Sequence, residues 1–158
     1  MDIALISSKQ DKASMNIWRS LLENYEFNLL MDTFDDNEVY VLGDVKLYLI
    51  NDKLITAENI DKKLKADLIV FLSKHKSKEN TPAMTVHSIG NWDKAEHGGS
   101  DKYICPTSPE FIKEFFIELN KNDLEDYEFT MESTHHGPKT SVPAVFIEPK
   151  CIKNEPSP

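Results

Sequence analysis

The sequence predicts a single α/β domain built on a sheet covered by helices. Short apolar segments alternate along the chain with segments whose apolar residues recur every three or four positions, as strands alternate with amphipathic helices. Residues 68–72 are apolar at every position, which is typical of a central strand covered on both faces. The chain has 158 residues, a length that suits one domain, and its sequence contains no internal repeat.

Three helices are expected from their apolar spacing and start signals. Ser14 is the expected N-cap of the first, which runs to about residue 23. An apolar stripe over 57–64 predicts the second. Ser108 followed by Pro109 predicts the start of the third, because a proline costs no hydrogen bond at the first helical position.

Seven strands are expected from short apolar or alternating segments. The turn signal Gly43-Asp44 makes a hairpin of the second and third. The expected strands cover residues 3–6, 39–42, 46–50, 68–72, 84–86, 127–131 and 144–147.

The expected domain covers residues 1–148, and residues 149–158 are an expected tail because they hold three prolines and no apolar period. A sheet that stops after the 144–147 strand is expected to leave an unpaired edge or an uncovered apolar face. We therefore expect either a homodimer that covers this surface or a chain of weakened function, with weakened function the favoured outcome.

Composition and charge favour a cytoplasmic protein. The N-terminus lacks the basic region of a signal peptide, no apolar segment is long enough for a membrane helix, and two distant cysteines indicate free thiols. A net charge of −9 argues against broad nonspecific binding to nucleic acid. It leaves room for one local basic patch at Lys74, Lys76 and Lys78 beside His75, for which a solvated loop is the alternative.

Polar residues that could carry chemistry gather late in the chain. Four of its five histidines and four of its five glycines lie between residues 87 and 137. Histidine titrates near neutral pH and ligates metals, and glycine lets the backbone approach a ligand closely. The three blocks are His87-Ser88-Ile89-Gly90-Asn91-Trp92, His97-Gly98-Gly99 and Glu132-Ser133-Thr134-His135-His136-Gly137-Pro138.

The adjacent pair His135-His136 is the sharpest feature of these blocks. Neighbouring residues on a strand point to opposite faces, so both rings reach one site only if the chain leaves the strand there, as Gly137-Pro138 favours. No HExxH or CxxC motif supports a metal by spacing alone.

Each of the other candidates has an ordinary structural alternative. His87 could be a strand-end histidine bonded to a carbonyl, Asn91 a turn residue, and Trp92 a packing residue. Residues 97–99 could form an anion-binding nest or a plain loop. Glu132 could act as a base or lie in solvent. Together, however, these groups are what hydrolysis of an ester requires: activation of water and donors for the oxyanion.

Taken together, these blocks resemble those of the archaeal and plant-type D-aminoacyl-tRNA deacylases. Thr134-His135-His136-Gly137-Pro138 combined with His87-x-x-Gly90-Asn91 is specific to that family, although its members continue much further at the C-terminus. The matching blocks, in the family's order, are 8–14, 71–77, 84–92, 97–99 and 132–138 with Pro143 and Phe146.

The resemblance implies hydrolysis of the ester between a D-amino acid and tRNA, a mixed sheet with helices on both faces like that of peptidyl-tRNA hydrolases, and zinc as cofactor. Carried over by position, it places in the site His75, His87, Asn91, His97, Gly98, Gly99, Glu132, His135 and His136. Together with our own candidates, we expect catalytic roles for His87, Asn91, Glu132, His135 and His136, and substrate binding by Lys74, His75, Lys76, Trp92, His97, Gly98 and Gly99. Zinc would be held by His87, His135 and His136. Two alternatives stay open: a tRNA-binding remnant without catalysis, and a metal-dependent hydrolase of small esters.

Overall fold

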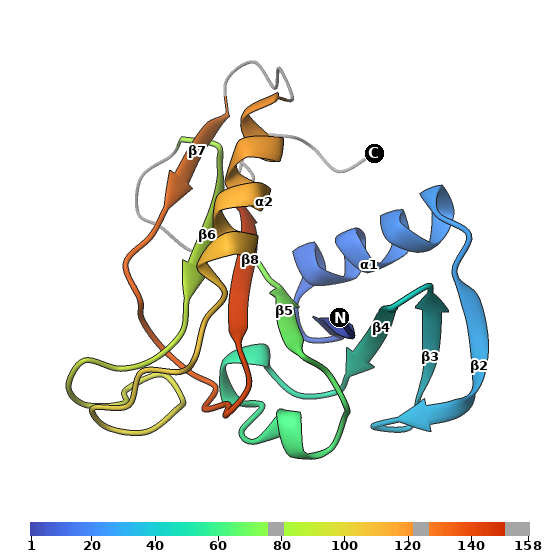
Figure 1. Ribbon diagram of the computed structural model, residues 1–158, viewed down its shortest axis with the longest axis horizontal. Coiled ribbons are helices and arrows are strands. Elements are labelled where there is room, and N and C mark those ends of the chain that lie inside the picture. Colours follow the sequence, from blue (N-terminus) through green and yellow to red (C-terminus); the bar gives the residue numbers. More distant parts are fainter. Residues whose placement is uncertain (76–80, 122–126, 151–158) are drawn as a thin grey trace.

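The computed structural model describes residues 1–75, 81–121 and 127–150. Within these ranges an eight-stranded mixed sheet carries two α-helices and two short 3-10 helices (Figure 1). The helices are α1 (Lys12–Asn24), η1 (Leu54–Thr56), η2 (Ile60–Lys62) and α2 (Pro109–Lys121). The strands are β1 (Ile3–Ser8), β2 (Asn28–Phe34), β3 (Asn37–Leu42), β4 (Val45–Ile50), β5 (Leu68–Leu72), β6 (Ala83–Ser88), β7 (Glu128–Met131) and β8 (Ala144–Lys150). The predicted single α/β domain is confirmed.

The strand order is β2-β3-β4-β1-β5-β8-β6-β7. β4, β1, β5 and β8 run parallel, β2 and β3 join β4 as an antiparallel hairpin series, and β6 is antiparallel to β8 but parallel to β7. All five residues of β5 are buried. The unbroken apolar run 68–72 therefore lies where predicted, in a central strand covered on both faces.

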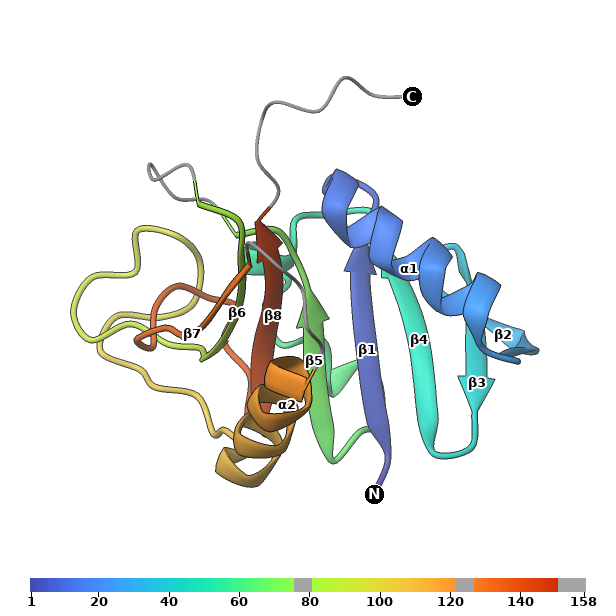
Figure 2. The ribbon, with the colours of Figure 1, turned by 90° about the horizontal axis from the view of Figure 1, so that it is seen from above.

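Alternate residues of β5 belong to two cores. Leu68 and Val70 join the core under α1 and α2, whereas Ile69 and Phe71 join the core under η1, η2 and the loops. Figure 2 shows both α-helices crossing the same side of the sheet. Both faces thus carry helical segments, as expected, but the two α-helices share one of them.

The order in which the chain adds strands to the sheet reverses at β1: β4 is added on one side of it and β5 on the other, which creates a crevice. The connection that follows β1 contains α1 and covers one face, whereas the connection from β4 to β5 contains η1 and η2 and covers the other. In open α/β sheets ligands bind at such a switch point, beside the carboxyl ends of the parallel strands. The residues just after β1, β4 and β5 lie at that end.

Two expectations about the helices are wrong in detail. Asp11 caps α1, accepting from the N–H groups of Ala13 and Ser14, so the helix starts three residues earlier than Ser14 predicts. The segment 57–64 forms no α-helix and contains instead the short 3-10 helix η2, because Asn59 takes a left-handed φ of 53° and donates its N–H to the Lys139 carbonyl. Its apolar side chains still pack into the core.

The C-terminal part of the sheet also differs from expectation. β8 runs to Lys150 and so includes Pro149, which the sequence assigned to the tail; residues 151–158 lie outside the described residues. β8 lies between β5 and β6, so the expected unpaired edge at residues 144–147 is wrong. The real edges are β7 and β2, a strand that no sequence signal predicted. With that, the unpaired edge is lost as a reason for a homodimer.

Candidate active site

Three histidines meet at the end of β6. His87 belongs to β6 and is 1% exposed, and the bridge between Ile89 and His135 brings the segment after β7 beside it. His136 has a left-handed φ of 46°, which breaks the strand alternation and turns both neighbouring rings toward His87. The ring centroids of His87 and His135 are 4.2 Å apart, and those of His135 and His136 are 4.5 Å apart. The predicted departure from the strand at this pair is confirmed.

The backbone sets the tautomer of all three rings. The Nδ1 atom lies 2.9 Å from the Ser88 carbonyl in His87, 2.8 Å from the Ser133 carbonyl in His135, and 2.6 Å from the Gly137 carbonyl in His136. A carbonyl oxygen only accepts, so each Nδ1 carries a proton, and in the neutral form of each ring the lone pair lies on Nε2. One ring nitrogen from each histidine lies within 4.8 Å of the other two.

Burial keeps the inner rings neutral. It lowers the pKa of His87 to about 3 and that of His136 to about 4, because a desolvated imidazole resists charging. Phe146 forms the apolar floor beneath them, with ring centroids 5.5 Å from His87 and 4.7 Å from His136. The buried Nε2 of His87 has no hydrogen-bond partner among the residues that the structure describes. Buried polar atoms seldom lack a partner, and such an atom calls for an explanation.

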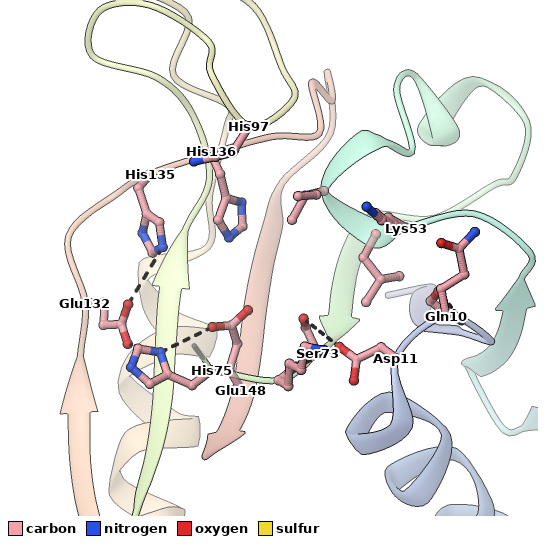
Figure 3. A pocket seen from close by; sticks show the side chains of 14 residues that line it. Gln10, Asp11, Lys53, Ser73, His75, His97, Glu132, His135, His136 and Glu148 are labelled. Carbon is pink, nitrogen blue, oxygen red and sulfur yellow. Dashed lines mark hydrogen bonds and ion pairs between the residues drawn. The ribbon is translucent and has the colours of Figure 1, made fainter. Parts of the chain in front are cut away.

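A second group of side chains adjoins the histidines. His75 Nδ1 lies 2.7 Å from Glu132 Oε1 and 3.5 Å from Glu148 Oε2. Burial, and then the charge of Glu132, raises the pKa of Glu148 to about 8, so Glu148 is mainly protonated at neutral pH. Glu132 Oε2 also lies 3.8 Å from His135 Nε2. Glu132 therefore links the two groups (Figure 3).

These groups form one side of a cavity of about 500 Å³, a volume in the range of small-molecule sites. The far side comes from segments that follow β1 and β4, including Gln10, Lys53 and Leu54 (Figure 3). The lining residues are Ser8, Gln10, Asp11, Lys53, Leu54, Ile55, Ser73, Lys74, His75, His97, Glu132, His135, His136 and Glu148.

Six of the candidate residues thus line the cavity: Lys74, His75, His97, Glu132, His135 and His136. His87 lies in contact with them as the buried member of the histidine cluster. Lys76 lies outside the described residues. Four others lie in the loop between β6 and α2 and are not among the lining residues: Asn91, Trp92, Gly98 and Gly99.

These four residues make hydrogen bonds or close packing contacts with other segments of the chain. Asn91 Nδ2 donates to the Gly98 carbonyl at 2.9 Å, and Trp92 Nε1 donates to the Thr134 carbonyl at 3.0 Å. The N–H of Gly99 donates to Glu58 Oε1 at 2.5 Å, which takes it away from the oxyanion role expected of the nest. Gly98 packs so closely on Ile55 that a side chain would overlap the Ile55 carbonyl oxygen.

Sequence reasoning missed most of the far side of the cavity. Gln10, Lys53 and Ser73 look like ordinary polar residues, and only their positions just after β1, β4 and β5 mark them. The rule that sites form where parallel strands end would have found all three, once the strand order was known.

Comparison with known proteins agrees with this geometry. The family model for D-aminoacyl-tRNA deacylase matches residues 62–152. Curated D-aminoacyl-tRNA deacylases from Thermococcus onnurineus and Pyrococcus horikoshii are each 39% identical over 91% of this chain, and the matches cover 56% and 55% of those proteins. The chain therefore spans about half the length of the curated relatives it matches.

Solved structures support the same fold. The crystal structure of AF0625, described as a conserved protein of unknown function, superposes with a TM-score of 0.84 at 30% identity, over 94% of this chain and 54% of that one. Campylobacter jejuni 5′-methylthioadenosine/S-adenosyl homocysteine nucleosidase, at a TM-score of 0.54 and 12% identity over 99% of this chain and 88% of its own, shares the fold alone. The family model covers more than half of the sequence and includes all five histidines of the chain. The chain belongs to the D-aminoacyl-tRNA deacylase family.

Proposed function

We propose that this chain hydrolyses the ester bond between a D-amino acid and the 3′ end of tRNA, releasing both. The observation that carries the proposal is the cluster of His87, His135 and His136 at a cavity that can hold a small molecule. Imidazole rings beside the carboxylate of Glu132 suit the activation of water at an ester. The family name supplies the substrate class.

We further propose that the three histidines hold zinc. Their set fits the ion: burial keeps His87 and His136 neutral, one ring nitrogen of each of the three histidines lies within 4.8 Å of the others, and the buried Nε2 of His87 has no hydrogen-bond partner among the described residues. The Nδ1 protons are donated to carbonyls, which is the arrangement usual for zinc-binding histidines. Three protein ligands with an open position are typical of catalytic rather than structural zinc. Lewis acidity is the chemistry that the ion supplies when bound.

The other residues then act on protons and position. Glu132 is our candidate for the base that takes the proton of the attacking water, because one of its oxygens faces His135 and the other is held by His75. His75 is fixed in turn by its backbone N–H, which donates to the Pro149 carbonyl at 3.1 Å. Leu54 and Ile55, across the cavity, exclude water on the far side and offer apolar contact to the substrate.

The proposed substrate indicates the cellular compartment and the partner of the protein. Aminoacyl-tRNA is used in translation, so we place the protein in the cytoplasm, with D-aminoacyl-tRNA as its partner. Within the described residues no helix is both long and apolar enough to span a bilayer. A homodimer is retained only as a proposal for sedimentation to test, since the edge that motivated it is paired.

The decisive assay compares D-tyrosyl-tRNA with L-tyrosyl-tRNA. We expect release of D-tyrosine only. His135→Ala should lower turnover by roughly a hundredfold or more. His135 is the variant of choice because it is the most exposed of the three rings, so the fold should survive its loss. Glu96→Gln, at an exposed loop position outside the cavity lining, is the matched control and should retain full activity.

Metal content is measured separately from turnover. The parent chain, purified and dialysed, should contain about one zinc, and His135→Ala should bind zinc at least ~100-fold more weakly, since even the loss of a group that only hydrogen-bonds a metal ligand costs about 10–100-fold in affinity. Equal hydrolysis of both esters, or a fully active His135→Ala, would contradict the proposed function. Full activity after exhaustive chelation would contradict the proposed role of zinc and would leave the proposed ester hydrolysis standing.

A further inference from the structure

The far side of the cavity carries a cation that the proposed mechanism does not use. Lys53 follows the turn after β4 and immediately precedes η1, and its side chain extends toward the cavity opposite His136 (Figure 3). Its carbonyl accepts from the Thr56 N–H and hydroxyl, which fixes the backbone at this position. Gln10 lies beside it on the turn after β1.

We propose that Lys53, assisted by Gln10, binds the phosphate group of the 3′-terminal nucleotide of the tRNA. This inference rests on the proposed function and deepens it. It assigns the two sides of the cavity to two parts of one substrate: the histidine side to the ester, and the Lys53 side to the nucleotide that carries it.

The charges around Lys53 leave its ammonium available. Among the described residues, no carboxylate lies within ion-pair distance of Lys53. Asp11, which lines the same side of the cavity, is already engaged: Oδ1 accepts from Ala13 and Ser14, and Oδ2 accepts from the Ser73 hydroxyl and the Lys74 N–H. Glu132 is paired with His75. The cation of Lys53 is therefore free for an anion on the ligand.

The substrate offers only one kind of anion near its reactive end. The ester carbonyl is neutral and the α-amino group is cationic, so a lysine in this cavity finds its counter-charge at the phosphate of the terminal nucleotide. Lysine binds phosphate as a point charge. Gln10 Nε2 donates to the Asn51 carbonyl at 2.8 Å, which orients the amide and leaves its second N–H for a phosphate oxygen. In a chain of net charge −9, such a local cation counteracts repulsion of a polyanion.

The test compares a substrate that has the phosphate with one that lacks it. Lys53→Met, Lys53→Arg and the control Lys62→Met, an exposed lysine on η2, are assayed on D-tyrosyl-tRNA and on the D-tyrosyl ester of adenosine. For Lys53→Met we expect a KM for D-tyrosyl-tRNA about tenfold higher with kcat nearly unchanged, and an unchanged KM for the adenosine ester. The salt dependence of log KM should fall by roughly one unit of slope. Lys53→Arg should restore most of the loss, and Lys62→Met should behave as the parent.

A binding measurement keeps this test separate from the proposed function. By calorimetry, adenosine 5′-monophosphate should bind the parent chain more tightly than adenosine, and Lys53→Met should abolish the difference. Equal affinity of the parent for both ligands overturns the proposal, as does a Lys53→Met defect of the same size on both esters or a Lys62→Met defect as large. If the parent hydrolyses neither ester, the proposed function fails, and the monophosphate comparison still decides the role of Lys53.

Discussion

Replacing Gly98 by alanine should damage the site through backbone overlap, and Gly43 provides a matched control. Both glycines have positive φ, 75° for Gly98 and 58° for Gly43, so alanine costs about 1–2 kcal/mol of strain at either position. A Cβ at Gly43 would meet nothing within 4 Å, whereas one at Gly98 would overlap the Ile55 carbonyl oxygen. Overpacking of this kind adds about 1–3 kcal/mol. That added cost should appear only in Gly98→Ala.

The two variants are compared by thermal unfolding and by deacylation of D-tyrosyl-tRNA. At about 2–4 °C per kcal/mol for a chain of this size, Gly98→Ala should melt roughly 2–12 °C below Gly43→Ala. It should also lose activity, because the displaced loop presses on Gly137, next to His136, whereas Gly43 lies in the hairpin turn at the other end of β4. If both variants lose the same stability, the close packing of residues 98 and 55 carries no weight and the reasoning is refuted.

Three further outcomes can be measured on the same material. Asp11→Ala should lower the free energy of unfolding by about 0.5–2 kcal/mol through loss of the α1 cap, seen in urea titrations; a stability equal to that of the parent would show that the cap is replaceable. Zinc at 100 times its Kd should raise the unfolding free energy of the chelated chain by about 2.7 kcal/mol and should not do so for His135→Ala, which differential scanning calorimetry checks; equal stabilisation of both would place the ion elsewhere. Met31→Lys, on the exposed face of edge strand β2, should change stability by less than about 0.5 kcal/mol, and if a dimer forms through β2 then sedimentation should show this variant as a monomer.

The sequence predicts elements that their own residues determine. β5 is such a case, because an unbroken apolar run has no other stable place than a covered strand. The helix start at Ser108 is another, since Ser108 Oγ accepts from the Phe111 N–H as a cap should. The prediction of a helix over 57–64 failed because the backbone conformation there depends on Asn59 and on a hydrogen bond to residue 139, far along the chain. No local spacing of apolar residues reveals such a contact.

The candidate site likewise has one side that the sequence predicts and one side that it does not. The histidine cluster could be predicted because strand ends, Gly137 and Pro138 are visible in the sequence. The opposite side could not, because Gln10 and Lys53 come together only once β1 and β4 are neighbours in the sheet. The role of Asn91 in chemistry stays a prediction, and its Nδ2 bonds to carbonyls of its own loop. Residue type alone does not distinguish a group that faces a ligand from one that holds a loop.

The hydrogen bonds that orient the three imidazoles have a consequence for how this protein can evolve. Each acceptor carbonyl lies one or two positions from its own histidine, so ring orientation is inherited with a few consecutive codons. The opposite side of the cavity is encoded by separate segments, after β1 and β4. Under the proposed function, substitutions in those segments alter substrate acceptance while the histidine side is left intact. A designer could diversify residues 10 and 53–55 as a library over an unchanged histidine side.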